Sequence, residues 1–179
     1  MHPASMEHMR RLRREHMGYL KALPAPRICD DGGLATAPEK TYRRLFEDLP
    51  GLEWCCCDIL PHPTVTHVKP DPFTLPFDSG SFDLVVSGQM LEHCRNPFRA
   101  VNEMRRVLKV GSLLAVIVPS TGPRHDAQDG WRFMDDAFRF IAAEVGGLQT
   151  IVDFIDRSNS METRAGKWHD HVWLARRTA

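Results

Sequence analysis

Two apolar segments joined by a helical segment constrain the fold of this chain most. Residues 81–87 and 113–118 are almost continuously apolar over the length of a strand, which is typical of strands buried on both faces of a parallel sheet. Between them, Asn96-Pro97 is a good helix start, and apolar residues then recur every three or four positions until Gly111. The order strand, helix, strand predicts a right-handed crossover between parallel neighbours.

The remaining segments extend this arrangement in both directions. Short apolar runs predict further strands at 27–29, 52–59 and 65–68, and an antiparallel C-terminal hairpin from 148–155 and 168–175, with a polar loop over 156–167. Helical spacing of apolar residues predicts helices over 6–23, 38–49 and 134–145. The expected fold class is α/β, a mostly parallel sheet with helices on both faces and an antiparallel C-terminal hairpin.

Composition narrows the classes of function. The 179 residues, 42% apolar and 26% charged, are ordinary for one soluble domain. Lys plus Arg and Asp plus Glu both number 23, so net charge gives no argument for a nucleic-acid partner. No run approaches the ~18 apolar residues of a membrane helix, and the first twenty residues lack the apolar core of a secretory signal. We therefore expect a cytoplasmic protein that binds neither nucleic acid nor membrane.

Two sequence features resemble metal sites without predicting one. Cys55, Cys56 and Cys57 are consecutive, and neighbours on a strand point to opposite faces, so the three thiols cannot converge on one ion. They are expected to fill a buried strand as small apolar residues. His169 and His171 share one strand face, but no third ligand accompanies them in the sequence. No metal is expected.

Small and acidic residues follow the predicted strands. They are Asp30-Asp31-Gly32-Gly33, Asp58, Asp71-Pro72-Phe73, Ser87-Gly88-Gln89 and the segment 119–122. Ligands of open parallel sheets bind beyond the carboxyl ends of the strands. Glycine lets a ligand approach the backbone, a carboxylate can accept ribose hydroxyls or an adenine amino group, and an apolar ring can pack on a purine. Each residue alone is most simply a cap or a turn, but the ordered set favours a nucleoside ligand.

The stretch from about 27 to 133 resembles the class I S-adenosylmethionine-dependent methyltransferases, and most closely a small subgroup with an SGQMLEH motif. The matching segments are DPFTLPF (71–77), SFDLVVSGQMLEH (81–93), RVLKVGS (106–112), PSTGPRH (119–125) and WRF (131–133). The resemblance implies S-adenosylmethionine as cofactor and a small-molecule acceptor methylated on O or N, in natural-product or glycan biosynthesis. We expect an N-terminal helical cap over 1–26 and a Rossmann-like domain over 27–179; a homodimer is compatible with the sequence.

The resemblance also implies a role for each strand end. Asp30 and Gly32 would belong to the loop beneath the methionine part of the cofactor, and Asp58 would hold the ribose. The residues facing the adenine would be Asp71 and Phe73, and those lining the floor beside the sulfonium would be Ser87, Gly88 and Gln89.

Two histidines are candidate catalytic residues. A hydroxyl or amine nucleophile benefits from a general base with a pKa near neutrality, and histidine suits that role. His125 follows the fifth strand, with Asp126 or Asp129 available to orient it, and His93 lies one turn into the next helical segment. A structural role is the simpler reading of His93.

The first loop departs from the family pattern. Of three spaced glycines only Gly32 is present, and Lys40 stands where the subgroup carries a neutral pair. Two alternatives to methyl transfer therefore stay open. One is an enzyme on the same scaffold acting as a cyclase, lyase or isomerase, and the other is a non-catalytic partner subunit.

Overall fold

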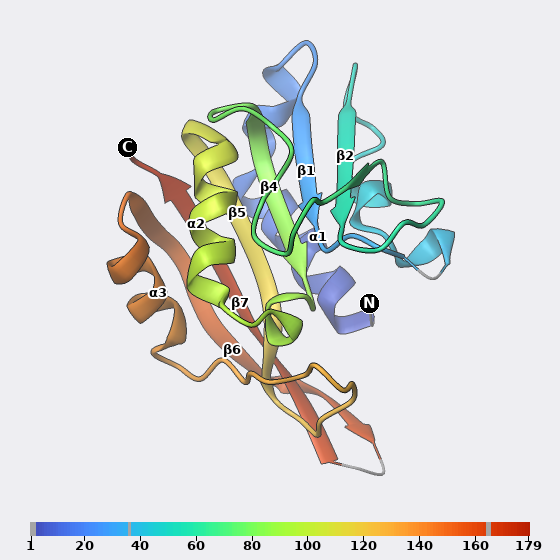
Figure 1. Cartoon of the computed structure of the whole chain (residues 1–179), viewed down its shortest axis with the longest axis vertical. Coiled ribbons are helices and arrows are strands. Elements are labelled where there is room, and N and C mark those ends of the chain that lie inside the picture. Colours follow the sequence, from blue (N-terminus) through green and yellow to red (C-terminus); the bar gives the residue numbers. More distant parts are fainter. Residues whose placement is uncertain (1–2, 36, 164–165) are drawn as a thin grey trace.

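One seven-stranded sheet organises the chain. The computed structural model describes residues 3–35, 37–163 and 166–179, and the strand order is β3-β2-β1-β4-β5-β7-β6 (Figure 1). The strands are β1 Arg27–Asp31, β2 Glu53–Asp58, β3 His67–Val68, β4 Phe82–Gly88, β5 Leu108–Thr121, β6 Leu148–Thr163 and β7 Gly166–Arg177.

The pairing confirms the predicted fold class. Strands β1 to β5 pair in parallel, whereas β7 pairs antiparallel with both β5 and β6. The crossover from β4 to β5 runs through α2 (Pro97–Val107), whose Asn96 cap accepts a hydrogen bond from the Arg99 backbone N–H. All seven residues of β4 are buried, as expected for a central parallel strand. The fold is a Rossmann-like α/β sheet with an antiparallel C-terminal hairpin.

Helices cover both faces of this sheet. Helices α2 and α3 (Ala137–Val145) lie on the near face in Figure 1, and α1 (Pro3–His16) lies behind it. Two buried clusters match these faces, because Met104 of α2 belongs to one and Leu12 of α1 to the other. The three cysteines of β2 divide between them as expected from strand alternation. Cys55 and Cys57 join the α2 cluster, and Cys56 joins the α1 cluster.

Two sequence predictions of secondary structure are wrong. The segment 38–49 forms two short 3-10 helices, η2 Pro38–Lys40 and η3 Tyr42–Leu45. Between them Thr41 is extended and its side chain accepts a hydrogen bond from the Arg43 N–H, a local bond that competes with a continuous helix. Of the predicted loop 156–167, residues 156–163 and 166–167 belong to β6 and β7, whose backbones pair up to Thr163 and Gly166, and 164–165 lie outside the described residues.

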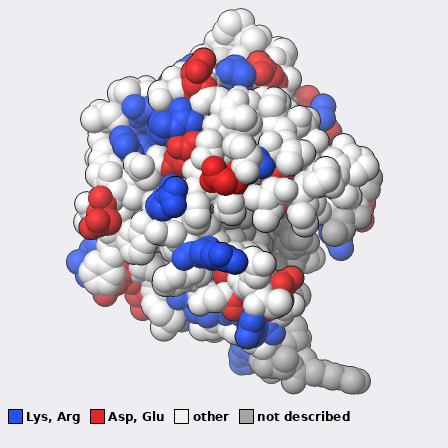
Figure 2. Space-filling model, in the orientation of Figure 1, with Lys and Arg blue, Asp and Glu red and all other residues white. Residues whose placement is uncertain are grey.

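The N-terminal segment predicted as one helix over 6–23 divides in two. Helix α1 ends at His16, and the 3-10 helix η1 continues over Gly18–Ala22. A further 3-10 helix, η4, spans Leu91–His93 after β4. Within the described ranges, no helix has both the length and the apolar character needed to cross a bilayer. Lys and Arg are interspersed with Asp and Glu on the face drawn in Figure 2.

Because α1 packs into the core, we expect it to unfold together with the sheet. Leu12 is 2% exposed, and Leu12→Ala should lower the free energy of unfolding by about 2–4 kcal/mol in a single transition. Denaturation in urea, followed by circular dichroism, measures this change. Arg14→Ala, on the exposed side of α1, is the matched control and should cost less than ~0.5 kcal/mol. Two separate transitions would instead make 1–26 an independent unit.

Candidate functional site

A cavity of about 520 Å³ opens where β1, β2 and β4 end. The residues that follow or end these strands, Gly32, Asp58 and Gln89, line it, and it extends past Met90 to His93. Its volume lies within the ~300–1,000 Å³ range of small-molecule sites. Its position agrees with the rule that ligands of parallel sheets bind beyond the carboxyl ends of the strands.

The loop after β1 places one glycine in the wall of the cavity and buries an acid behind it. Gly32 has φ +82°, a conformation that favours glycine. A Cβ on Gly33 would lie 2.5 Å from Cγ of Asp30, so the loop closes tightly over that side chain. Asp30 is 1% exposed, and its carboxylate has no hydrogen-bond partner among the described residues. Burial, with the charges of Asp31 and Asp58, raises the pKa of Asp30 to about 8.

A buried ion pair lies next to this loop. Lys69 Nζ donates to Oδ1 of Asp31 at 2.8 Å, and both side chains are at most 4% exposed. Burial raises the pKa of Asp31 while Lys69 opposes the change. The Ser87 hydroxyl donates to the Asp31 carbonyl at 2.8 Å. Ser87 therefore supports the loop from beneath and is absent from the cavity wall.

Asp58, the residue predicted to hold the ribose, lines the cavity. Its carboxylate oxygens accept hydrogen bonds from the Leu34 N–H at 3.4 Å and the Leu60 N–H at 3.2 Å. A carboxylate has about four lone-pair sites, so these two bonds leave capacity for a ligand. The backbone amides also fix the carboxylate in the cavity wall. This geometry suits acceptance of hydroxyl donors from a bound ligand.

Tyr42 covers one of the other two predicted floor residues, Gly88, and leaves Gln89 at the cavity. A Cβ on Gly88 would overlap the Tyr42 hydroxyl, so the glycine is needed for the approach of a protein side chain. Tyr42 is fully buried, and its hydroxyl lies 2.5 Å from Oγ of Ser5 in α1. Gln89 adopts φ +56° and donates through Nε2 to Asp170. Gln89 reaches the cavity, and Gly88 does not.

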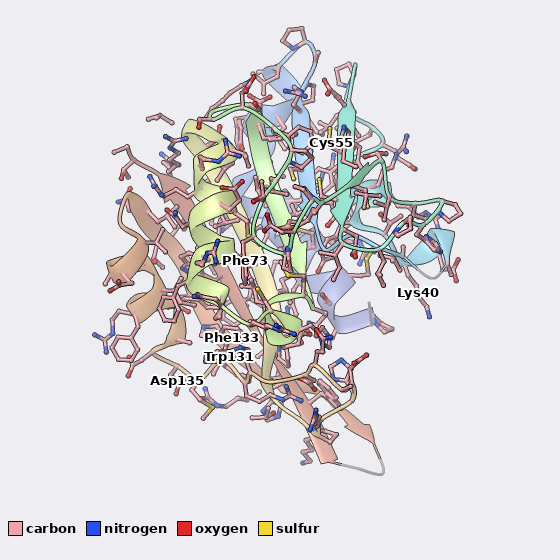
Figure 3. All side chains as sticks on the ribbon, in the orientation of Figure 1. Lys40, Cys55, Phe73, Trp131, Phe133 and Asp135 are labelled. Atoms are coloured by element: carbon pink, nitrogen blue, oxygen red, sulfur yellow. The ribbon has the colours of Figure 1, made fainter. Side chains whose placement is uncertain are left out.

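The structure does not bring Asp71 or Phe73 to the cavity. Asp71 is exposed, and its carboxylate accepts bonds from the Phe73 N–H and the Thr74 hydroxyl, which lower its pKa. This is a turn in which the side chain satisfies local donors. Phe73 packs against the α2 side of the core beneath the Arg99 guanidinium, 4.4 Å from the ring centroid (Figure 3). Pro72 is the residue of this segment that lines the cavity.

The predicted histidines meet at the far end of the cavity. The rings of His93 and His125 are edge to face, with centroids 4.9 Å apart. His93 lines the cavity, as do Asp126 and Gln128 from the loop that carries His125. Burial lowers the pKa of His93, and the neighbouring His125 lowers it further.

The sequence offered Asp126 or Asp129 to orient His125, and the structure places Asp129 against its ring. Its Oδ2 lies 2.8 Å from Nδ1 of His125. Arg132 binds both carboxylate oxygens of Asp129, at 2.5 and 2.8 Å, and this ion pair holds the pKa of Asp129 well below its usual range. Arg132, Asp129 and His125 therefore form a connected polar chain at the cavity edge.

Several residues near the cavity were not predicted from the sequence to belong to the site. Glu92 lies within the SGQMLEH motif, yet only the structure shows that it is fully buried, with a pKa raised by burial to about 8. Tyr42 and Lys69 enter through segments far away in the chain. Lys40, considered a neighbour of the cofactor from the sequence, is exposed and absent from the cavity wall (Figure 3). Leu34 does line the cavity.

Comparison with known proteins shows that part of the chain is similar to methyltransferases. Residues 51–116 match the family described as "Methyltransferase domain". The chain is 35% identical over 57 residues to a 2-phytyl-1,4-naphtoquinone methyltransferase of Nostoc punctiforme, covering 32% of this chain and 25% of that protein. It is 30% identical over 129 residues to a malonyl-[acyl-carrier protein] O-methyltransferase of Enterobacter lignolyticus, covering 63% and 51%. The chain thus spans a quarter to about half of the length of these relatives.

Solved structures share the fold. The 1,6-didemethyltoxoflavin-N1-methyltransferase of Burkholderia thailandensis, with S-adenosylhomocysteine bound, superposes with a TM-score of 0.69 at 13% identity, covering 98% of this chain and 79% of that one. The [4+2]-cyclase SpnF superposes with a TM-score of 0.66 at 14% identity, covering 95% and 82%. At these identities the likeness establishes the architecture, which is the one predicted from the class I methyltransferase resemblance. The SGQMLEH subgroup stays a prediction.

The buried Asp30 predicts a pH dependence of stability. Its folded pKa of about 8 exceeds the ordinary 3.8, so between these values the folded chain holds a proton that the unfolded chain has lost. The contribution of Asp30 to stability is therefore greatest below pH 4 and declines as pH rises towards 8. Asp30→Asn should remove this loss and be more stable than the wild type by about 1–3 kcal/mol at pH 8, with a smaller difference at pH 5.

Urea denaturation of both proteins from pH 5 to pH 8 measures this difference. Asp71→Asn, whose carboxylate is exposed, is the control and should show no gain that grows with pH. A constant difference between Asp30→Asn and the wild type across this range would contradict the assignment.

Proposed function

We propose that the chain is an S-adenosylmethionine-dependent methyltransferase that acts on O or N of a small molecule. The single observation that carries the proposal is the cavity of about 520 Å³ at the ends of β1, β2 and β4, which combines Gly32 with the Asp58 carboxylate. The methyltransferase-domain match over 51–116 includes β2, β4 and the cavity residues between them. The names of the relatives and structural neighbours support the same reaction class.

The residues of the cavity fit the cofactor in charge and in shape. Asp58 is available to accept the ribose hydroxyls, because its two existing bonds, from the Leu34 and Leu60 amides, leave lone pairs unused. Pro72 and Leu60 supply apolar surface in the same wall. The adenine would pack on this surface, a role that the family resemblance assigned to Phe73. Asp30 is buried beneath the loop with no hydrogen-bond partner among the described residues, and a bound sulfonium would favour its charged form, whereas the charge of Lys69 in the cavity wall is already paired with Asp31.

Bound S-adenosylmethionine supplies a methyl group already activated for displacement: the acceptor–carbon bond forms as the carbon–sulfur bond breaks, and the electron pair stays on sulfur. The protein then has to align the acceptor, exclude water and remove its proton. His93 and His125 lie at the end of the cavity where an acceptor would enter. Asp129 fixes the His125 ring, so the two imidazoles favour loss of the acceptor proton.

A second candidate function is an enzyme of this fold that no longer transfers methyl, such as a cyclase. The observation that favours it is Tyr42, which covers Gly88 where the strand end would otherwise lie open to a cofactor. The structural likeness to the [4+2]-cyclase SpnF is compatible with this reading. The absence of S-adenosylmethionine binding, with turnover of a substrate, would distinguish the second candidate from the first.

Calorimetric titration with S-adenosylmethionine and S-adenosylhomocysteine tests the cofactor assignment. We expect micromolar dissociation constants for both. Asp58→Ala should weaken binding at least tenfold, because hydrogen bonds to a charged group contribute about 1.5–3 kcal/mol. Asp71→Ala should change affinity less than twofold, since its carboxylate serves a turn outside the cavity. Equal effects of both substitutions would remove Asp58 from the ligand site.

Methyl transfer to a panel of phenols, carboxylic acids and primary amines tests the role of the histidines. His125→Asn should lower kcat/KM about 100-fold on any acceptor that is turned over, because proton transfer in the transition state typically contributes ~10²–10⁴-fold. The affinity for S-adenosylhomocysteine should stay within twofold. His67→Asn, on β3, is the control and should retain activity. Full activity of His125→Asn would exclude this histidine from catalysis.

A further inference from the structure

Three potential metal ligands converge at the histidine end of the cavity. Glu92 and His93 come from η4, and His125 comes from the loop after β5. Their ligand atoms all lie within 4.8 Å of one another. Two imidazoles and one carboxylate form a donor set that zinc and other divalent transition metals use with further positions open. The sequence did not predict this group, because its members are split between two segments about thirty residues apart.

Glu92 supplies an independent sign that a cation belongs here. The side chain is 0% exposed, and neither carboxylate oxygen has a hydrogen-bond partner among the residues that the structure describes. Its closest basic neighbour is Nε2 of His93, 3.7 Å from Oε1. The charged form of a buried carboxylate without hydrogen bonds is costly, so the group either holds a proton or is compensated by a cation, and a bound metal ion would take the place of that proton. Both oxygens of Glu92 are therefore available to coordinate an ion.

The surroundings of His125 match those of a metal-bound histidine. Nδ1 is engaged by Asp129 at 2.8 Å, which leaves Nε2 as the ligand atom. Metal-ligating imidazoles commonly donate their other nitrogen to a carboxylate, which fixes the ring and its tautomer. Arg132 holds that carboxylate through two bonds. The rings of His125 and Trp168 are also edge to face, with centroids 5.0 Å apart. These contacts fix the orientation of the imidazole within its loop.

The geometry needs only a small contraction. Ligand atoms around a tetrahedral zinc are roughly 3.4 Å apart, given metal–ligand distances of about 2.0–2.1 Å. The His125 side chain is 40% exposed and belongs to a surface loop, so it can move towards Glu92 and His93. Because His93 lines the cavity, the open coordination position of such an ion would face the space proposed for the acceptor.

We propose that Glu92, His93 and His125 bind one divalent transition-metal ion at the cavity edge, where it coordinates the acceptor oxygen. The arrangement of these three side chains supports the metal site, whereas its part in methyl transfer rests on the proposed function. With both imidazoles bound to the ion, the metal rather than a histidine base promotes deprotonation, because a coordinated hydroxyl loses its proton to water more easily. The oxygen lone pair is then available to form the bond to the methyl carbon while the carbon–sulfur bond breaks.

Titration of the metal-free full chain with Zn²⁺ against a chromophoric chelator tests the site without any activity assay. We expect one equivalent bound with micromolar or tighter affinity, and at least a tenfold loss in both Glu92→Gln and His125→Asn. His169→Asn and His67→Asn are matched controls and should bind as the wild type does. If Glu92→Gln fails to fold, His125→Asn still decides, because its side chain is partly exposed.

Substitution with Co²⁺ distinguishes this site from the five cysteines of the chain. Ligands of nitrogen and oxygen give visible absorption without the near-ultraviolet charge-transfer band of a thiolate. Stoichiometric binding with that signature supports the proposal. No binding, a thiolate band, or equal affinity in His125→Asn overturns it.

Titration with S-adenosylhomocysteine separates the metal site from the proposed function. Metal binding without cofactor binding would retain the site and remove the methyltransferase assignment. Cofactor binding without metal binding would retain the methyltransferase and overturn the site.

Discussion

The parallel pairing of β1 with β2 on one side and β4 on the other is the constraint on which the rest of the structure depends. The register aligns Asp31 with Cys57 and Asp30 with Val86, so three strand ends stop at one level of the sheet. Parallel strands place their carboxyl ends on the same edge. The acids and glycines that follow them are therefore neighbours in space, although they span some sixty residues of sequence. The cavity is the direct result of this register.

Burying polar groups next to that cavity costs free energy, and the fold offsets only part of this cost. Lys69 compensates Asp31 through a short ion pair, whereas Asp30 and Glu92 have no hydrogen-bond partner within the described ranges. A buried carboxylate without a partner is destabilising, and such groups concentrate at functional sites. Asp30 lies below the proposed cofactor floor, and Glu92 lies at the proposed metal site. A cation bound in this region would stabilise the charged form of each acid, which burial disfavours.

Helix α1 connects the N-terminal segment to the same region. Ser5 contacts the hydroxyl of Tyr42, and Tyr42 in turn covers Gly88. His8 lies 3.7 Å from the Asp170 carboxylate, which also accepts a hydrogen bond from Gln89. The helix therefore supports the end of β4 through a chain of polar contacts as well as through its apolar face. Changes in α1 are expected to reach the cavity floor by this route.

Much of the fold could be predicted because its signals are local. Continuous apolar runs defined β4 and the centre of β5, and the Asn96-Pro97 start defined α2. The helix expected over 38–49 was wrong, because one Thr41 side chain offered the backbone a competing hydrogen bond. The loop expected over 156–167 was wrong for a different reason. Its described residues belong to β6 and β7, whose backbone pairing does not depend on an apolar pattern.

By itself, the sequence determined the chain order of the strands, the helices α2 and α3, the alternation of the three cysteines and the set of acids at strand ends, because periodicity and capping act over a few residues. Only the tertiary structure decided which of those acids face the cavity. Asp58 faces the cavity while Asp71 completes a turn, and Gly88 makes room for Tyr42. These outcomes depend on side chains that arrive from distant segments, and no local pattern specifies which of them will fill a given space.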